Sequence, residues 1–116
     1  MFADYPSDAL KASGTAAAPT SGSNFASLAA PRAGIYKITF EYTITGAAES
    51  NALNVRSKVN GATYLDFPSG GLNAVQVQIF NRVTLDGTNP VQLAAGGNNA
   101  TASTVYTGTI ICQQIA

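Results

Sequence analysis

Six carboxylate side chains are the groups of this chain that could do acid–base or metal chemistry, and they are dispersed along it. They are Asp4, Asp8, Glu41, Glu49, Asp66 and Asp86. Their spacing does not suggest a general acid paired with a general base, and no Asp-rich loop repeats as a calcium site would require. Asp66 and Asp86 lie beside predicted turns, where the usual role of a carboxylate is to cap the backbone.

The other catalytic residue types are equally sparse. The chain has no histidine, which excludes Ser-His and Cys-His pairs and any histidine metal site. Its one cysteine, Cys112, follows Ile110 and Ile111 and is predicted to be a small buried hydrophobic residue. The glycine pairs Gly70–Gly71 and Gly96–Gly97 lack the helix and lysine of a phosphate-binding loop. We therefore predict a protein that is not an enzyme and that needs no cofactor and no metal ion.

The composition is low in charge. Charged residues make up 10% of the 116 residues, and six basic residues balance six acidic ones. A neutral surface attracts neither nucleic acid nor an anionic membrane, so neither is an expected partner. It does favour association with other protein chains. The alternative is a monomeric β domain covered by Thr, Asn and Gln.

The start of the chain differs from the rest. Residues 12–22 are almost all small, and the first residues lack the basic and apolar regions of a signal peptide. We predict an extended N-terminal arm over residues 1–22 and a folded domain over residues 23–116. The large apolar residues of the arm are candidate anchors on a partner: Phe2, Tyr5, Pro6 and Leu10. The alternative is that this segment folds back as an extra strand of its own domain.

Strict alternation between Ile35 and Ile44 predicts a strand with one face in the core. Asn60–Gly61 predicts a hairpin, and further short alternating segments are separated by Gly, Asn and Pro turns at intervals of about ten residues. The fold class is therefore all-β, an antiparallel sandwich or barrel. The predicted core residues are Tyr36, Ile38, Phe40, Ile44, Val55, Val77, Ile79 and Ile110.

Five segments occur in an order that resembles the trimeric jelly rolls of the complement-globular-head and tumour necrosis factor type. They are Pro31–Phe40, Val59–Ala62, Val83–Gly87, Val91–Leu93 and Tyr106–Ile110. The resemblance covers roughly residues 24 to 115 and implies a jelly-roll sandwich that forms a homotrimer. It differs from the family around Asp86, where the usual Gly-Asp is absent. We predict subunit contacts through Tyr42, Phe80, Tyr106 and Cys112.

Small jelly rolls of this kind occur as capsid decoration proteins and as fibre heads of viruses. The predicted function is a decoration (cement) protein of a phage or virus particle. It would be made in the host cytoplasm and would bind the major capsid protein at the capsid surface of the virion. The alternative is a receptor- or glycan-binding head of a phage fibre or adhesin. Its loop residues would then be Tyr64, Phe67, Asn73, Asn98 and Asn99.

Overall fold

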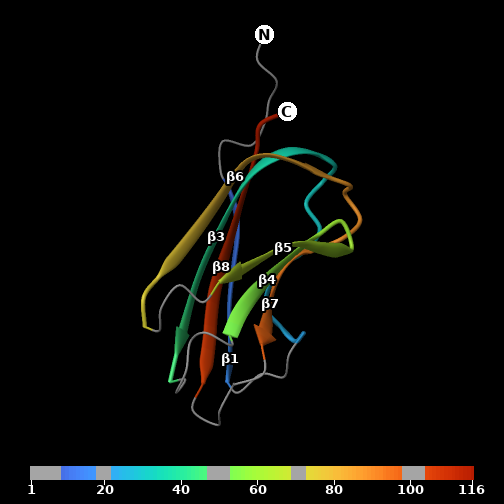
Figure 1. The fold of residues 1–116 in the computed structure, drawn as a ribbon. Helices are drawn as coiled ribbons and strands as arrows, with labels where there is room; N and C mark the ends of the chain where they lie inside the picture. The colour runs from blue at the N-terminus through green and yellow to red at the C-terminus, as the bar shows by residue number, and fades with distance from the viewer. Residues whose placement is uncertain (1–8, 18–21, 47–52, 69–72, 98–103) are drawn as a thin grey trace.

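The computed structural model describes residues 9–17, 22–46, 53–68, 73–97 and 104–116, and these ranges form strands and turns without a helix (Figure 1). The eight strands are β1 (Leu10–Ala17), β2 (Asn24–Leu28), β3 (Gly34–Thr45), β4 (Leu53–Val59), β5 (Ala62–Pro68), β6 (Gln76–Leu85), β7 (Val91–Gly97) and β8 (Val105–Gln114). They form two four-stranded sheets, ordered β1-β8-β3-β6 and β2-β7-β4-β5. The predicted all-β antiparallel sandwich is confirmed.

The strand order is that of one long hairpin rolled into a sandwich. β4 pairs with β5 across Asn60–Gly61, and outward from this turn β3 pairs with β6, β2 with β7 and β1 with β8. Asn60 and Gly61 have φ values of 54° and 77°, the positive values that a two-residue Asn-Gly hairpin turn needs. An eight-stranded roll of this kind is jelly-roll-like. The Asn-Gly motif therefore marks the tip about which the whole chain folds.

The core lies between the two sheets, and β3 crosses its middle. The even-numbered residues of β3 from Tyr36 to Ile44 are at most 2% exposed, while the residues between them are exposed or half-buried. Val55 of β4, in the other sheet, and Ile110 of β8, beside β3, are completely buried. These positions confirm the predicted core. Val77 and Ile79 do not, because both point outward from β6.

The N-terminal segment departs from the predicted arm. Residues Leu10–Ala17 form β1, which pairs antiparallel with β8 along its whole length. The structure therefore corrects the predicted boundary between arm and domain. Residues 10–17 belong to the sandwich, which is the alternative that the segment folds back as an extra strand. Residues 1–8 and 18–21 lie outside the described part of the chain.

Small side chains are what allow β1 to occupy this place. Ala12, Gly14 and Ala16 face inward, and β1 packs directly on β2 of the other sheet. A Cβ atom added to Gly14 would lie 2.0 Å from the carbonyl oxygen of Phe25, closer than any real contact. The run of Ala, Gly, Ser and Thr is thus an edge strand in close contact with its neighbour, rather than part of an extended arm.

Candidate functional site

The first half of β6 has its polarity reversed relative to the other strands. Gln76 and Gln78 are half-buried on the inward side, whereas Val77 and Ile79 are 49% and 52% exposed on the outer face. Val75, which precedes the strand, is 66% exposed. Since β6 is the last strand of its sheet, these side chains lie along an edge of the sandwich. An edge strand with an apolar outer face is a template for association.

A β-bulge causes the reversal. Tyr36 and Ile38 of β3 are opposite Val83 and Phe80 of β6, so the one residue between them on β3 faces two residues on β6. The extra residue turns the second half of β6, where Val83 is buried. The sequence alone shows valine and isoleucine alternating with glutamine here and does not show which set faces the core. The one available signal is Asn81. The odd-numbered positions around it hold the apolar residues Val77, Ile79 and Val83, so a polar residue at 81 interrupts their alternation.

A second bulge shapes β5, the last strand of the other sheet on the same side. Ser57 is opposite Leu65 but its neighbour Lys58 is opposite Thr63, which leaves Tyr64 as the extra residue. The hydroxyl of the buried Ser57 donates to the Leu65 carbonyl at 2.8 Å and accepts from the Leu65 N–H at 3.1 Å. The bulge is therefore bonded within the structure, and it leaves Tyr64 and Leu65 37% and 46% exposed.

Three of these side chains, at alternate positions along one edge, form a surface that we call the apolar patch. It consists of Val75, Val77 and Ile79. The other exposed large hydrophobic residues among those described lie elsewhere: Tyr64 and Leu65 on β5, Leu10 at the start of β1 and Ile115 near the end of the chain. Scattered single apolar residues are ordinary on a protein surface, but a group of them at one edge marks an interaction site.

An aromatic cluster supports the patch from inside. The ring of Tyr64 contacts Phe80 edge to face, with centroids 5.2 Å apart. Phe80 stacks on Phe67 at 5.9 Å, and Phe67 stacks on Tyr42 at 5.8 Å. Large rings thus lie between the two sheets on the β5–β6 side, on the inward side of the strand that carries the patch.

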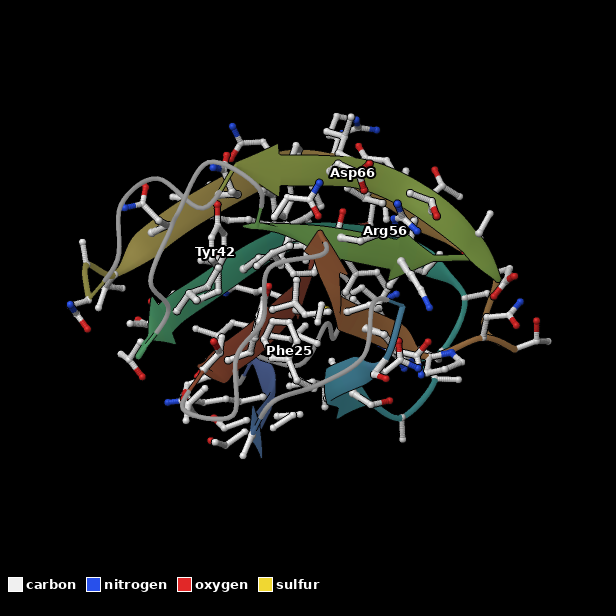
Figure 2. All side chains as sticks on the ribbon, turned by 60° about the horizontal axis from the view of Figure 1, so that its bottom comes forward. Phe25, Tyr42, Arg56 and Asp66 are labelled. Carbon is white, nitrogen blue, oxygen red and sulfur yellow. The ribbon has the colours of Figure 1, made fainter. Side chains whose placement is uncertain are left out.

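Three of the four predicted subunit contacts are interior residues. Tyr42, Tyr106 and Cys112 are 2%, 1% and 1% exposed, on strand faces directed at the opposite sheet (Figure 2 shows Tyr42). The Tyr106 hydroxyl donates to the buried Gly96 carbonyl at 3.0 Å. Burial raises the pKa of both tyrosines and raises that of the Cys112 thiol to about 12. The prediction that these three residues contact another subunit is wrong, since β3 and β8 direct them into the core of their own chain.

The remaining predicted contacts have different positions. Phe80 is half-buried at the wide side of the core, directly beneath Tyr64. Leu10 is 43% exposed and lies opposite Cys112 in the β1–β8 pair. Phe2, Tyr5 and Pro6 lie outside the described residues. The predicted role of Cys112 as a small buried hydrophobic residue is confirmed.

The candidate glycan-binding residues do not form one site among the described residues. Phe67 is 4% exposed and belongs to the aromatic cluster, so the prediction that it is a loop contact is wrong. Tyr64 is on β5, and Asn73 is an exposed residue with φ 65°. Asn98 and Asn99 lie outside the described residues.

The described carboxylates have structural partners or stand apart. Asp86 Oδ1 accepts the backbone N–H groups of Thr88 and Asn89 at 2.9 and 3.1 Å, which confirms the predicted turn cap. Asp66 lies within β5 and pairs with the Arg56 Nε at 2.9 Å on the outer face of its sheet, so the cap predicted for it is wrong (Figure 2).

Among the described residues, no three His, Cys, Asp or Glu side chains gather closely enough to hold a metal ion. No described helix has the length and apolar character needed to cross a membrane.

Comparison with known proteins identifies the fold. No protein-family model and no curated protein matches the chain. Among solved structures, PRD1 vertex protein P5 superposes with a TM-score of 0.54, over 91% of this chain and 96% of that chain. The sequence identity is 13%, so the likeness is one of fold. It extends over nearly the whole of both chains and includes both sheets.

Proposed function

We propose that this chain is a structural protein of a phage particle, a capsid decoration protein that assembles as a homotrimer and stabilises the shell. The observation that carries the proposal is the apolar patch. Val77 and Ile79 point away from the core while glutamines occupy the inward positions of the same strand. In the monomer these two aliphatic side chains remain exposed to water. Association with another chain would bury them and gain the corresponding hydrophobic free energy.

The likeness of fold supports the kind of assembly. PRD1 vertex protein P5 is by its name a vertex protein, and the match of fold covers 91% of this chain and 96% of that chain. The resemblance of the sequence to trimeric jelly rolls supports a threefold arrangement. In such a trimer the patches of three copies would meet around the axis, since a closed ring buries the same surface on every subunit.

A particle-association experiment tests this function. Particles would be purified by density gradient from cells that carry the phage encoding the chain, and their proteins would be quantified by mass spectrometry. The expected result is co-sedimentation of the chain with the major capsid protein at a fixed ratio, and particles lacking the chain that break at a lower temperature. A chain abundant in the lysate but absent from the particles would contradict the proposal.

A matched pair of variants connects the function to the patch. Val77→Asp with Ile79→Asp should abolish particle association, because it places charges where apolar side chains would be buried. Gln113→Asp is the control, since Gln113 is an exposed residue of β8 in the same sheet. The control should bind as the wild type does. Equal binding by all three proteins would show that the patch plays no part.

A further inference from the structure

Charges of opposite sign lie at the two ends of the apolar patch. In the β3–β6 pair Glu41 is opposite Val77, and it belongs to the outward set of β3, on the same side as the patch. Arg82 lies beyond Ile79 at the other end and is an exposed residue of β6. Five residues of extended strand separate Val77 from Arg82, which is about 15 Å. The side chains of Glu41 and Arg82 are therefore too far apart to meet within one chain.

Neither charge has a partner of opposite sign among the described residues. The one ion pair there joins Arg56 to Asp66 on the other sheet. All six basic residues of the chain belong to the described part, so no lysine or arginine of its own chain forms an ion pair with Glu41. Glu41 is half-buried, and an apolar surface that covered it would enclose an unpaired carboxylate, which is strongly unfavourable. A partner that covers the patch should therefore supply a cation.

A hollow beside the patch suits such a cation. It has a volume of about 180 Å³, and its lining includes Glu41, Val75 and the hydroxyl-bearing residues Thr43, Thr107 and Thr109. The carboxylate and hydroxyl oxygens can accept hydrogen bonds from a guanidinium group, which has five donors. Val75 provides an apolar wall for the methylene stem of a long basic side chain. The hollow thus fits an arginine that arrives together with an apolar surface.

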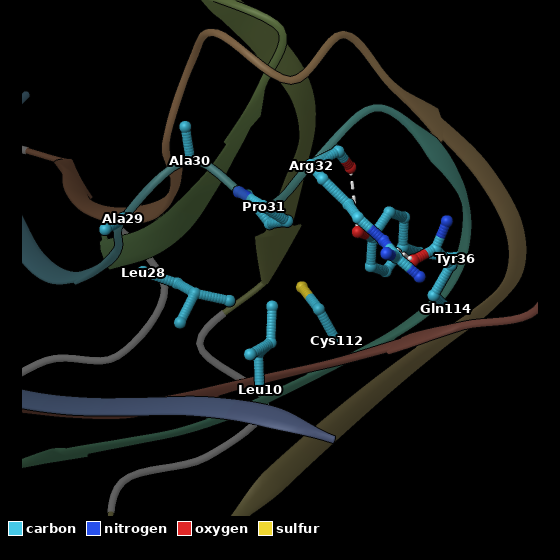
Figure 3. Close-up of a pocket in the computed structure, with 9 residues that line it drawn as sticks. All are labelled: Leu10, Leu28, Ala29, Ala30, Pro31, Arg32, Tyr36, Cys112 and Gln114. Atoms are coloured by element: carbon cyan, nitrogen blue, oxygen red, sulfur yellow. Dashed lines mark hydrogen bonds between the residues drawn. The ribbon is translucent and has the colours of Figure 1, made fainter. Parts of the chain in front are cut away.

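The basic residues of a neighbouring copy differ in their availability for this hollow. Three have polar partners in their own chain: Arg56 with Asp66, Lys58 with Asn24, and Arg32 with Gln114 at the wall of a separate cavity (Figure 3). Of the others, Lys11 lies on β1 at the far edge of the sheet. Lys37 lies on β3, one strand in from the edge, and Arg82 lies on the edge strand itself. Arg82 is therefore the cation best placed to reach a neighbour at this edge.

We infer that the three copies of the proposed trimer are arranged head to tail, with Arg82 of each copy in the hollow beside Glu41 of the next. The β6 strands would then run around the threefold axis rather than along it. This inference rests on the proposed function, because it needs an assembly through the patch. Strands along the axis would bring three copies of Glu41 together at one level and three copies of Arg82 at another. Like charges disfavour that arrangement, whereas a head-to-tail contact pairs opposite charges and closes into a ring.

Chemical cross-linking tests the arrangement directly. The variant with both Glu41→Cys and Arg82→Cys would be treated to completion with a short bismaleimide and separated on a denaturing gel. The native thiol of Cys112 is buried and should not react. Head-to-tail packing predicts a linked species of three chain masses, because each copy is joined to the next. Each single substitution should leave the chain unlinked, since its thiol has no second thiol within reach.

A charge exchange provides an independent test in solution. Glu41→Arg or Arg82→Glu alone brings like charges together. Each should raise the concentration at which half of the chain is trimeric by about tenfold or more. The variant with both substitutions should return toward the wild-type value. Lys11→Glu is the matched control, because it reverses an exposed charge of the same sheet at the opposite edge, and it should behave as the wild type does.

The contradicting results separate this inference from the proposed function. Linking that stops at two chain masses would overturn the inference, since a twofold contact would then pair the same residues. Linking by either single substitution would also overturn it, because equivalent ends of the copies would then meet. Trimers that give no link, with charge reversals as neutral as Lys11→Glu, would overturn the inference and leave the assembly intact. A wild type that forms no oligomer would overturn both.

Discussion

The two edges of the sandwich are built in opposite ways. At the narrow edge, where β1 meets β2, the inward residues are alanine and glycine and the backbones nearly touch. At the wide edge, between β5 and β6, the rings of Tyr64, Phe67 and Phe80 separate the sheets, and apolar side chains remain exposed. The wide edge exposes Val75, Val77 and Ile79, which the proposed assembly would bury. The position of the large side chains thus distinguishes the two edges.

Removing a ring at the wide edge should have the largest effect on stability. Phe67→Ala deletes a residue that is 4% exposed and contacts Tyr42, Phe40 and Phe80. We expect a loss of about 3–5 kcal/mol in the free energy of unfolding, measured by chemical denaturation. Tyr64→Ala, at the exposed rim of the same cluster, should cost only about 1 kcal/mol. Equal losses from the two variants would mean that the cluster does not act as the support described.

Adding one methyl group should test the narrow edge. Gly14→Ala places a Cβ against the Phe25 carbonyl, so β1 must move away from β2. We expect a loss of about 1–3 kcal/mol in the free energy of unfolding. Ser13→Ala changes the neighbouring outward residue and removes only its exposed hydroxyl bond to Thr109, so it should cost about 0.5 kcal/mol. If Gly14→Ala is equally neutral, the edge is looser than the structure indicates.

A substitution in the turn after β6 should change the free energy of unfolding by a smaller amount, and the change should depend on pH. Backbone N–H groups of Thr88 and Asn89, with the Asn89 amide, lower the pKa of Asp86 from 3.8 to about 2. Because the folded pKa is the lower one, this stabilisation is present above the unfolded pKa. It is lost as the pH falls from about 4 toward 2. Asp86→Asn should therefore be less stable than the wild type at neutral pH, and denaturation curves should converge in acid. A difference that does not change with pH would contradict this origin.

The elements that could be predicted from the sequence are those whose pattern has a single physical meaning. The alternation of Ile35–Ile44 and the Asn60–Gly61 turn identify a β fold and its central hairpin. The strand β1 was open only as the alternative to an arm, because small residues suit an edge strand only where its neighbour comes as close as β2 does. The outward face of β6 could not be recognised. Its reversal depends on a bulge opposite β3, which the spacing of Val77 and Ile79 does not reveal.

The subunit contacts were misplaced for a related reason. Large residues such as Tyr42 and Tyr106 suit an interface as well as a core, and alternation does not say which sheet faces them. Within the sandwich each has the opposite sheet above it, and the phenol hydroxyl of Tyr106 reaches a backbone carbonyl there. The exposed apolar residues are the smaller ones of the edge strand. Their exposure depends on the bulge opposite β3, which sets which residues of β6 face outward.

The solution molar mass of the wild type and of the variant with Val77→Asp and Ile79→Asp tests the central claim most directly. Sedimentation equilibrium should give the wild type and the Gln113→Asp control three times the chain mass of 11.9 kDa. The double variant should have the mass of one chain and an unchanged far-ultraviolet β spectrum. A wild type that stays at one chain mass over the whole concentration range, or a double variant that remains trimeric, would contradict assembly through the apolar patch.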